Sequence, residues 1–110
     1  MSKLKPPQIS DLLRKVRACV QFDRWSLSIH AIERKNERNV EFQDIVHVLK
    51  TGFHEERKIL FDEHYASWKY AIRGTTFDGD DLRLIVTFVT GDLLVVTVIR
   101  VGTIRKWKKK

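Results

Sequence analysis

One segment of the chain carries three side chains suited to binding a phosphate group and moving a proton. His30, Arg34 and Arg38 are spaced four residues apart, so on an α-helix they fall within an arc of roughly 80°. Arginine presents a planar fork of donors that suits phosphate, and histidine exchanges protons near neutral pH. The spacing therefore predicts a stripe for phosphate binding and proton transfer. The alternative is an exposed helix face whose arginines pair with carboxylates such as Glu33 and Glu37.

A second group of cations lies in the C-terminal half, where the sequence predicts a sheet. Lys69 and Arg73 are separated by an even number of residues, so they share one face of a strand. A cross-strand cation beside them would build a shallow electropositive surface for an RNA or DNA backbone. Each cation taken singly can equally be a solvated surface residue. The members of the group are Arg57, Lys58, Lys69, Arg73, Arg83 and Arg100.

The positive charge is concentrated at the C-terminal end. The formal net charge is +7, and five of the last six residues are Lys or Arg, which leaves the rest of the chain mildly basic. Lys106 and Lys108 flank Trp107, and cations beside an aromatic ring suit phosphate neutralisation and base stacking. A solvated tail that aids solubility is the alternative.

Helices are predicted in the N-terminal half and strands in the C-terminal half. Apolar residues recur at helical spacing over residues 9–20 and 41–51, and a further helix is expected over 29–38. Asn39 can end that helix in the left-handed conformation. Beyond Gly52 the pattern alternates, which predicts strands over 53–60, 68–73, 82–89 and 93–101. Turn residues at 77–81 and 90–92 separate the last three strands, and the short second turn predicts a hairpin.

This order of elements predicts an α+β fold, with the N-terminal helices packed on one face of a four-stranded, mainly antiparallel sheet. A length of 110 residues fits one domain, which we place at residues 1–104, followed by a basic tail at 105–110. The apolar runs are too short to span a bilayer. No apolar run at the N-terminus suits a signal sequence, and the single Cys19 cannot form an internal disulfide. A cytoplasmic protein is therefore expected.

Metal and nucleotide cofactors are not indicated by the sequence. His54 and His64 stand among acidic residues, but their spacing is not typical of a metal site. The five glycines are isolated turn residues and do not form a phosphate-binding loop. Cys19 belongs to the apolar period of the first predicted helix and is expected to be buried and inert.

Several segments resemble a family of small bacterial domains of uncharacterised function: SIHAIERKNER, NVEFQDIVHVLKTG, WKYAIRG, an acidic glycine turn and two apolar strands ending VVTVIR. The pattern of that family opens with His-Ala-x-x-Arg-x-x-x-Arg. Its layout is similar to that of BrnT and MqsR, members of the RelE-like superfamily of toxins from type II toxin–antitoxin pairs. The resemblance covers about residues 12–101. It implies a RelE-like fold and a metal-independent endoribonuclease that cuts messenger RNA and is neutralised by a cognate antitoxin.

The resemblance also implies site residues. The MqsR pattern of a lysine on the first strand matches Lys58, and its polar residue after a tryptophan on the second matches Lys69. Its tyrosine on the third strand falls near positions 82–83, where this chain has no tyrosine. Its final lysine falls near Arg100.

Roles follow from the resemblance together with the helical stripe. The 2′-hydroxyl of one ribose attacks the adjacent phosphorus, and cations stabilise the added negative charge. His30 is expected to act as general acid or base, while Arg34, Arg38 and Lys69 hold the phosphate. Alternatives of the same fold are a non-catalytic nucleic-acid-binding module and a protein-interaction domain that pairs through an exposed strand edge. Further RNA contacts are expected from Lys58, Arg73, Arg83, Arg100, Lys106, Trp107 and Lys108.

Overall fold

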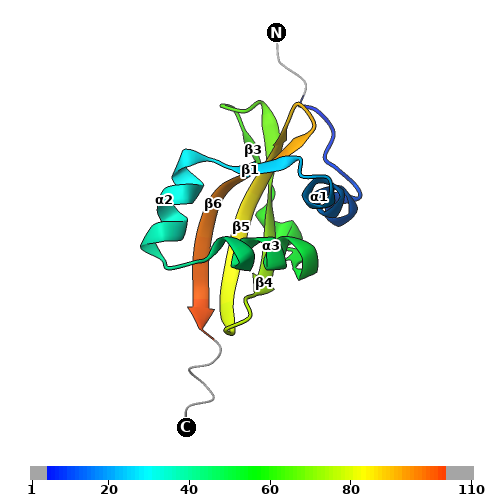
Figure 1. The fold of residues 1–110 in the computed structure, drawn as a ribbon. Coiled ribbons are helices and arrows are strands. Elements are labelled where there is room, and N and C mark those ends of the chain that lie inside the picture. Colours follow the sequence, from blue (N-terminus) through cyan, green and yellow to red (C-terminus); the bar gives the residue numbers. More distant parts are fainter. Residues whose placement is uncertain (1–4, 104–110) are drawn as a thin grey trace.

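Three helices pack on one face of a mixed, six-stranded sheet in a computed structural model of the protein, which describes residues 5–103 (Figure 1). The α+β class and the placement of the N-terminal helices on one face are as the sequence predicts. The helices are α1 (Leu12–Gln21), α2 (Ile29–Glu37) and α3 (Phe42–Thr51). The strands are β1 (Trp25–Leu27), β2 (Phe53–His54), β3 (Leu60–Asp62), β4 (Ser67–Thr75), β5 (Asp80–Val89) and β6 (Asp92–Thr103), with a short 3₁₀ helix, η1 (Glu56–Lys58), before β3.

The strand order β1-β6-β5-β4-β2 combines an antiparallel meander with one parallel edge. β4, β5 and β6 pair antiparallel, β1 runs parallel to β6, and β3 pairs with the start of β4. The sequence predicts four strands, and the structure differs in two places. Three residues are too few to show an alternating pattern, so β1 is defined only by its pairing with β6. The strand expected over 53–60 is broken into β2 and β3 by η1, whose three residues are all charged.

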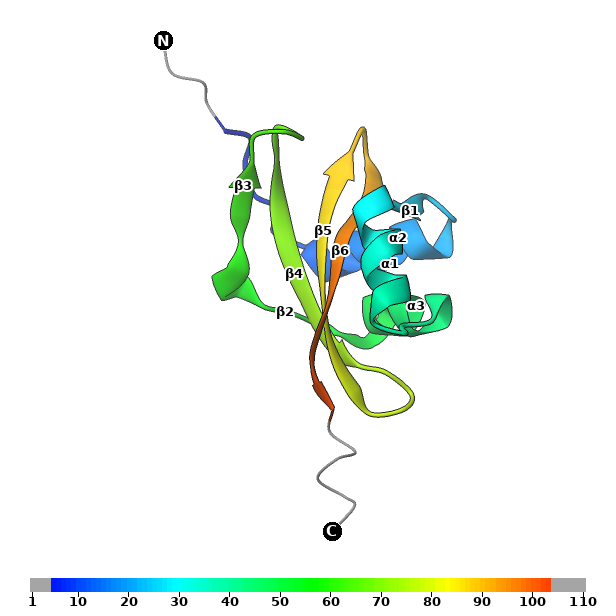
Figure 2. The ribbon, with the colours of Figure 1, turned by 90° about the vertical axis from the view of Figure 1, so that its left-hand side faces the viewer.

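The core lies between the helices and the sheet. Strand residues that point to the helices alternate with residues that point to the opposite face, which we call the helix-free face. Figure 2 shows the helices on one side of β4, β5 and β6, and η1 on the other. Lys69, Arg73 and Arg83 are neighbours of core residues along β4 and β5, so they belong to the helix-free face. The fully buried core includes Val16, Ile45, Val48, Leu49, Tyr70, Ile72, Leu82, Leu84, Val95 and Val98.

Local signals determine where the helices and the last hairpin end. The Ser28 hydroxyl accepts a hydrogen bond of 2.9 Å from the Ala31 N–H and caps α2. Asn39 adopts a φ of 54°, the left-handed conformation predicted from its position after the helix. Thr90 and Gly91 have φ values of 49° and 88° and join β5 to β6 in a two-residue turn. This confirms the predicted hairpin.

Gly52 allows α3 and β4 to approach each other closely. A Cβ atom at this position would lie 2.6 Å from the Arg73 carbonyl oxygen and 2.7 Å from the Val48 carbonyl oxygen. Both oxygens belong to the backbone, so the clash cannot be relieved by a side-chain rotation. We expect Gly52→Ala to lower the free energy of unfolding by about 2 kcal/mol, as measured by urea denaturation. Gly102→Ala is the control, because a Cβ there meets no atom within 4 Å; an equal loss in both variants would contradict this account.

Candidate functional site on the helix-free face

Two guanidinium groups converge on one carboxylate on the helix-free face. Arg73 of β4 and Arg83 of β5 are directly opposite each other in the antiparallel register. Glu55 follows β2, and its N–H donates a hydrogen bond of 2.8 Å to the Ala71 carbonyl, which holds Glu55 against β4. The Glu55 carboxylate accepts hydrogen bonds from Arg83 Nε at 2.5 Å and Nη2 at 3.1 Å, and from Arg73 Nη1 at 2.9 Å. Asp81 accepts two further bonds from Arg73, at 2.8 and 2.7 Å.

We call Glu55, Arg73, Asp81 and Arg83 the Glu55 cluster; its formal charges sum to zero. Hydrogen bonds from Arg83 and then Arg73 outweigh the effect of burial and lower the pKa of Glu55 from 4.5 to about 2. The carboxylates in turn raise the pKa of both arginines. At the centre of the cation group expected from the sequence, two carboxylates therefore neutralise the two guanidiniums.

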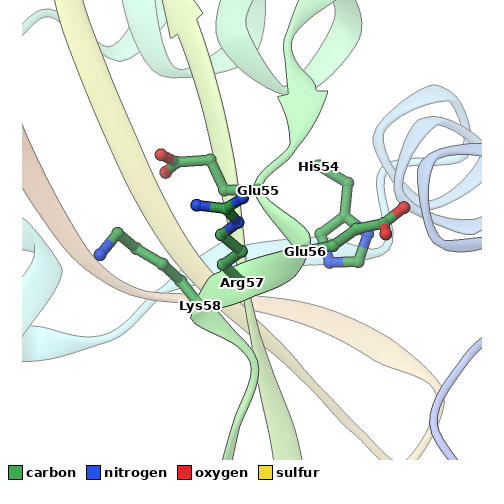
Figure 3. A pocket seen from close by; sticks show the side chains of 5 residues that line it. All are labelled: His54, Glu55, Glu56, Arg57 and Lys58. Atoms are coloured by element: carbon green, nitrogen blue, oxygen red, sulfur yellow. The ribbon is translucent and has the colours of Figure 1, made fainter.

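Positive charge without a carboxylate partner lies beside this cluster. A hollow of about 560 Å³ is lined by His54, Glu55, Glu56, Arg57 and Lys58. Figure 3 shows Glu55, Arg57 and Lys58 pointing to one side of the segment, and His54 and Glu56 pointing to the other. Arg57 and Lys58 are exposed, and neither forms an ion pair within the part of the chain that the structure describes. The hollow therefore combines a held carboxylate with two available cations.

Lys69 shares the helix-free face but has an acidic partner. Its Nζ lies 3.3 Å from Asp62 Oδ2. Burial alone would raise the pKa of Asp62, but hydrogen bonds from the Tyr65 N–H, the Lys69 ammonium and the His64 N–H lower it below its ordinary value. The ion pair therefore ties Lys69 of β4 to the end of β3.

Arg100 lies on the other side of the sheet. It is opposite the core residue Leu82 in the β5–β6 register, so it points toward the helices. It forms an ion pair with Asp80 and donates a hydrogen bond to the Arg38 carbonyl at the end of α2. Of the cations expected as cross-strand partners, Arg83 shares the face of Arg73, whereas Arg100 lies on the opposite face of the sheet.

The helical stripe also lies apart from the Glu55 cluster. His30 and Arg34 are on α2, Arg38 is its C-cap, and α2 packs against β6 and β1 on the helix-covered side. His30 is exposed. Arg34 lies 2.7 Å and Arg38 3.8 Å from the same carboxylate oxygen of Glu37. The structure thus pairs both arginines within the helix, and it does not bring them together with the cations of the helix-free face.

Glu55 and Asp81 are the site residues that sequence reasoning missed. The available signal was the pair Arg73 and Arg83 on neighbouring predicted strands, because two cations directly opposite each other repel and need an anion between them. Three other predicted contacts, Lys106, Trp107 and Lys108, lie outside the described residues.

Within residues 5–103, no helix is long and apolar enough to cross a membrane. In the same part of the chain, no group of three His, Cys, Asp or Glu side chains is placed to hold a metal ion.

The fold and site together define a small α+β domain with three helices on one face of a mixed sheet and an ion-paired cluster on the other. The sequence model of a family described as a domain of unknown function (DUF4258) matches residues 27–100. Because the match covers more than half of the chain, the protein belongs to this family. The matched region includes α2, α3 and the Glu55 cluster. No curated protein and no solved structure gives a significant match to the chain.

Proposed function

We propose that the helix-free face is the RNA-binding site of a metal-independent endoribonuclease of the toxin type. The observation that carries the proposal is that Arg73 and Arg83, opposite each other on neighbouring strands, converge on a single oxyanion. Glu55 supplies that anion in the free protein. A phosphodiester offers the same charge and a pair of acceptor oxygens, so it can take the place of the carboxylate. The proposal includes a RelE-like fold and a cytoplasmic location. It also includes a cognate antitoxin that covers this face.

Displacement of Glu55 would give the carboxylate a chemical role. With a pKa of about 2 it is a poor base while the guanidiniums hold it. A phosphate that takes these hydrogen bonds also brings a negative charge nearby, and both changes raise the pKa of Glu55. The carboxylate then accepts the proton of the ribose 2′-hydroxyl as the 2′-oxygen bonds to phosphorus.

The remaining steps use the cations around the carboxylate. Arg73 and Arg83 stabilise the negative charge that develops on the phosphorane. The bond from phosphorus to the 5′-oxygen breaks, and Lys58 donates the proton that this leaving oxygen needs. The products are a 2′,3′-cyclic phosphate and a 5′-hydroxyl. His30, Arg34 and Arg38 take no part in this scheme, which differs from the expectation drawn from the helical stripe.

An RNA-cleavage assay in EDTA tests the proposal. The purified protein should cut single-stranded RNA in the chelator, and Arg83→Gln should abolish cleavage and weaken binding about fivefold, because a charge-assisted contact to phosphate is lost. Arg24→Gln is the matched control, since it removes the same charge from an exposed pair with Asp92. A 2′-deoxy nucleotide at the cleaved position should block cleavage and leave binding intact. Normal cleavage by Arg83→Gln combined with loss in His30→Ala would overturn the proposed site and favour the helical stripe.

A second candidate is a non-catalytic nucleic-acid-binding module. It is favoured by the burial of the Glu55 carboxylate, whose side chain is only 14% exposed and ties the segment around η1 to β4 and β5. A carboxylate with that structural role need not move. RNA binding that weakens steeply with salt, without any cleavage product, would select this candidate.

A further inference from the structure

Phe53 places an aromatic ring beside the Glu55 cluster. It is directly opposite Arg73 in the antiparallel pairing of β2 with β4. Both side chains therefore project from the helix-free face, with Cβ atoms roughly 5 Å apart. Phe53 is 56% exposed. Within the described chain no other ring packs on it.

The backbone on either side of Phe53 keeps its ring in solvent. Gly52 packs closely against the Val48 and Arg73 carbonyl oxygens at the start of β2, with no space for a side chain between them. His54 takes the inward position of this two-residue strand and lies edge-on to Tyr70, with ring centroids 5.7 Å apart. Alternation along the strand then directs Phe53 to the helix-free face.

Phe77 and Phe42, two other strongly exposed rings, occupy a different environment. Phe77 is 72% exposed, yet its ring centroid lies 4.0 Å from that of His47 on α3. Phe42 stacks on Trp25 with a centroid separation of 5.1 Å. Both are anchored by residues of the helix layer or of β1, away from the two guanidiniums.

We infer that Phe53 stacks on an unpaired nucleobase of the strand whose phosphate lies at Arg73 and Arg83. The inference rests on the proposed function and deepens it by naming the substrate class, single-stranded RNA with a splayed base. A single ribose separates a phosphate from its base, and Phe53 is one cross-strand position away from Arg73. In a duplex both faces of a base are covered by its neighbours, whereas a single strand leaves a face for an aromatic ring. Phe53 thus selects for unpaired RNA without reading its sequence.

The test compares an RNA with and without bases. The probes are a short single-stranded RNA with 2′-O-methyl riboses, which cannot be cleaved, and the abasic form of the same strand. Phe53→Ala should weaken binding to the base-bearing strand about tenfold and leave binding to the abasic strand unchanged. Phe53→Trp should retain the affinity of the wild type. Phe77→Ala is the control, because it removes another largely exposed ring from a different surface.

The outcomes separate this inference from the proposed function. Loss of the base-dependent affinity in Phe53→Ala but not in Phe77→Ala supports the inference. Equal binding of the base-bearing strand by Phe53→Ala and the wild type, with binding still weakened by Arg83→Gln, overturns the inference and leaves the proposed site intact. Failure of the wild type to bind either strand overturns both.

Discussion

Replacement of Glu55 by glutamine should tighten RNA binding and abolish cleavage. In the proposed binding mode, the phosphate displaces a carboxylate whose pKa is lowered from 4.5 to about 2, which corresponds to roughly 3 kcal/mol of favourable interaction. Glutamine keeps one acceptor oxygen but loses the charge, so only part of this energy is recovered by the incoming phosphate. We expect the affinity for uncleavable single-stranded RNA to rise about tenfold. Cleavage should be lost because an amide cannot accept the 2′-hydroxyl proton.

The same substitution should reduce stability, and the reduction should depend on pH. The folded protein holds the Glu55 carboxylate ionised below its ordinary pKa, so the unfolded chain binds more protons between about pH 4.5 and pH 2. The stabilisation is fully present above pH 4.5 and is lost as the pH falls through this window. Urea unfolding should therefore show Glu55→Gln to be about 2 kcal/mol less stable than the wild type at pH 6. The difference should shrink to roughly 1 kcal/mol or less at pH 3.

Glu56 provides the matched control for both effects. It is adjacent in sequence, lines the same hollow and points to the other side of the segment (Figure 3). Glu56→Gln changes the net charge by the same amount without touching Arg73 or Arg83. If both variants bind RNA equally well, net charge rather than release of the two guanidiniums explains the gain, and Glu55 does not occupy the phosphate site.

The parts of the fold that the sequence predicts are those with local causes. α3 is defined by apolar residues three and four positions apart, and the β5–β6 hairpin by Thr90-Gly91 between two apolar runs. β1 has no comparable signal. It forms because the Arg24 carbonyl accepts from the Leu93 N–H at 3.0 Å and the Ser28 N–H donates to the Val95 carbonyl at 2.9 Å. Such contacts join residues far apart in the sequence and leave no periodic pattern.

The candidate site was predictable only in part for a similar reason. Even spacing correctly places Lys69 and Arg73 on one face of β4, and the short turn before β5 brings Arg83 beside them. Which carboxylate reaches these cations depends on where the strand after Gly52 breaks. A shift of one residue would present Glu56 in place of Glu55, because successive side chains point to opposite faces. The break at η1 decides between the two, and the run of charged residues from 55 to 58 does not reveal its position.

Replacement of Arg100 by glutamine should destabilise the protein without weakening RNA binding at the helix-free face. Arg100 forms an ion pair with Asp80, which is only 8% exposed, and donates to the Arg38 carbonyl at the end of α2. It therefore connects the start of β5, the end of β6 and α2. Arg100→Gln removes a charged partner of the nearly buried Asp80 carboxylate, and we expect a loss of about 3 kcal/mol in the free energy of unfolding.

Arg24→Gln again serves as the control, because its pair with Asp92 is largely exposed and should contribute less than about 1 kcal/mol. The double variant Asp80→Asn/Arg100→Gln should lose less unfolding free energy than the two single variants lose together, since each substitution removes the same interaction. The amide hydrogens in the last turn of α2 should exchange faster in Arg100→Gln than in the wild type, because the Arg38 carbonyl loses its hydrogen bond from Arg100. An Arg100→Gln protein that unfolds like the wild type but binds RNA more weakly would reverse this assignment. Arg100 would then act as the RNA contact that the sequence suggests, and an RNA strand would have to reach the helix-covered side of β6.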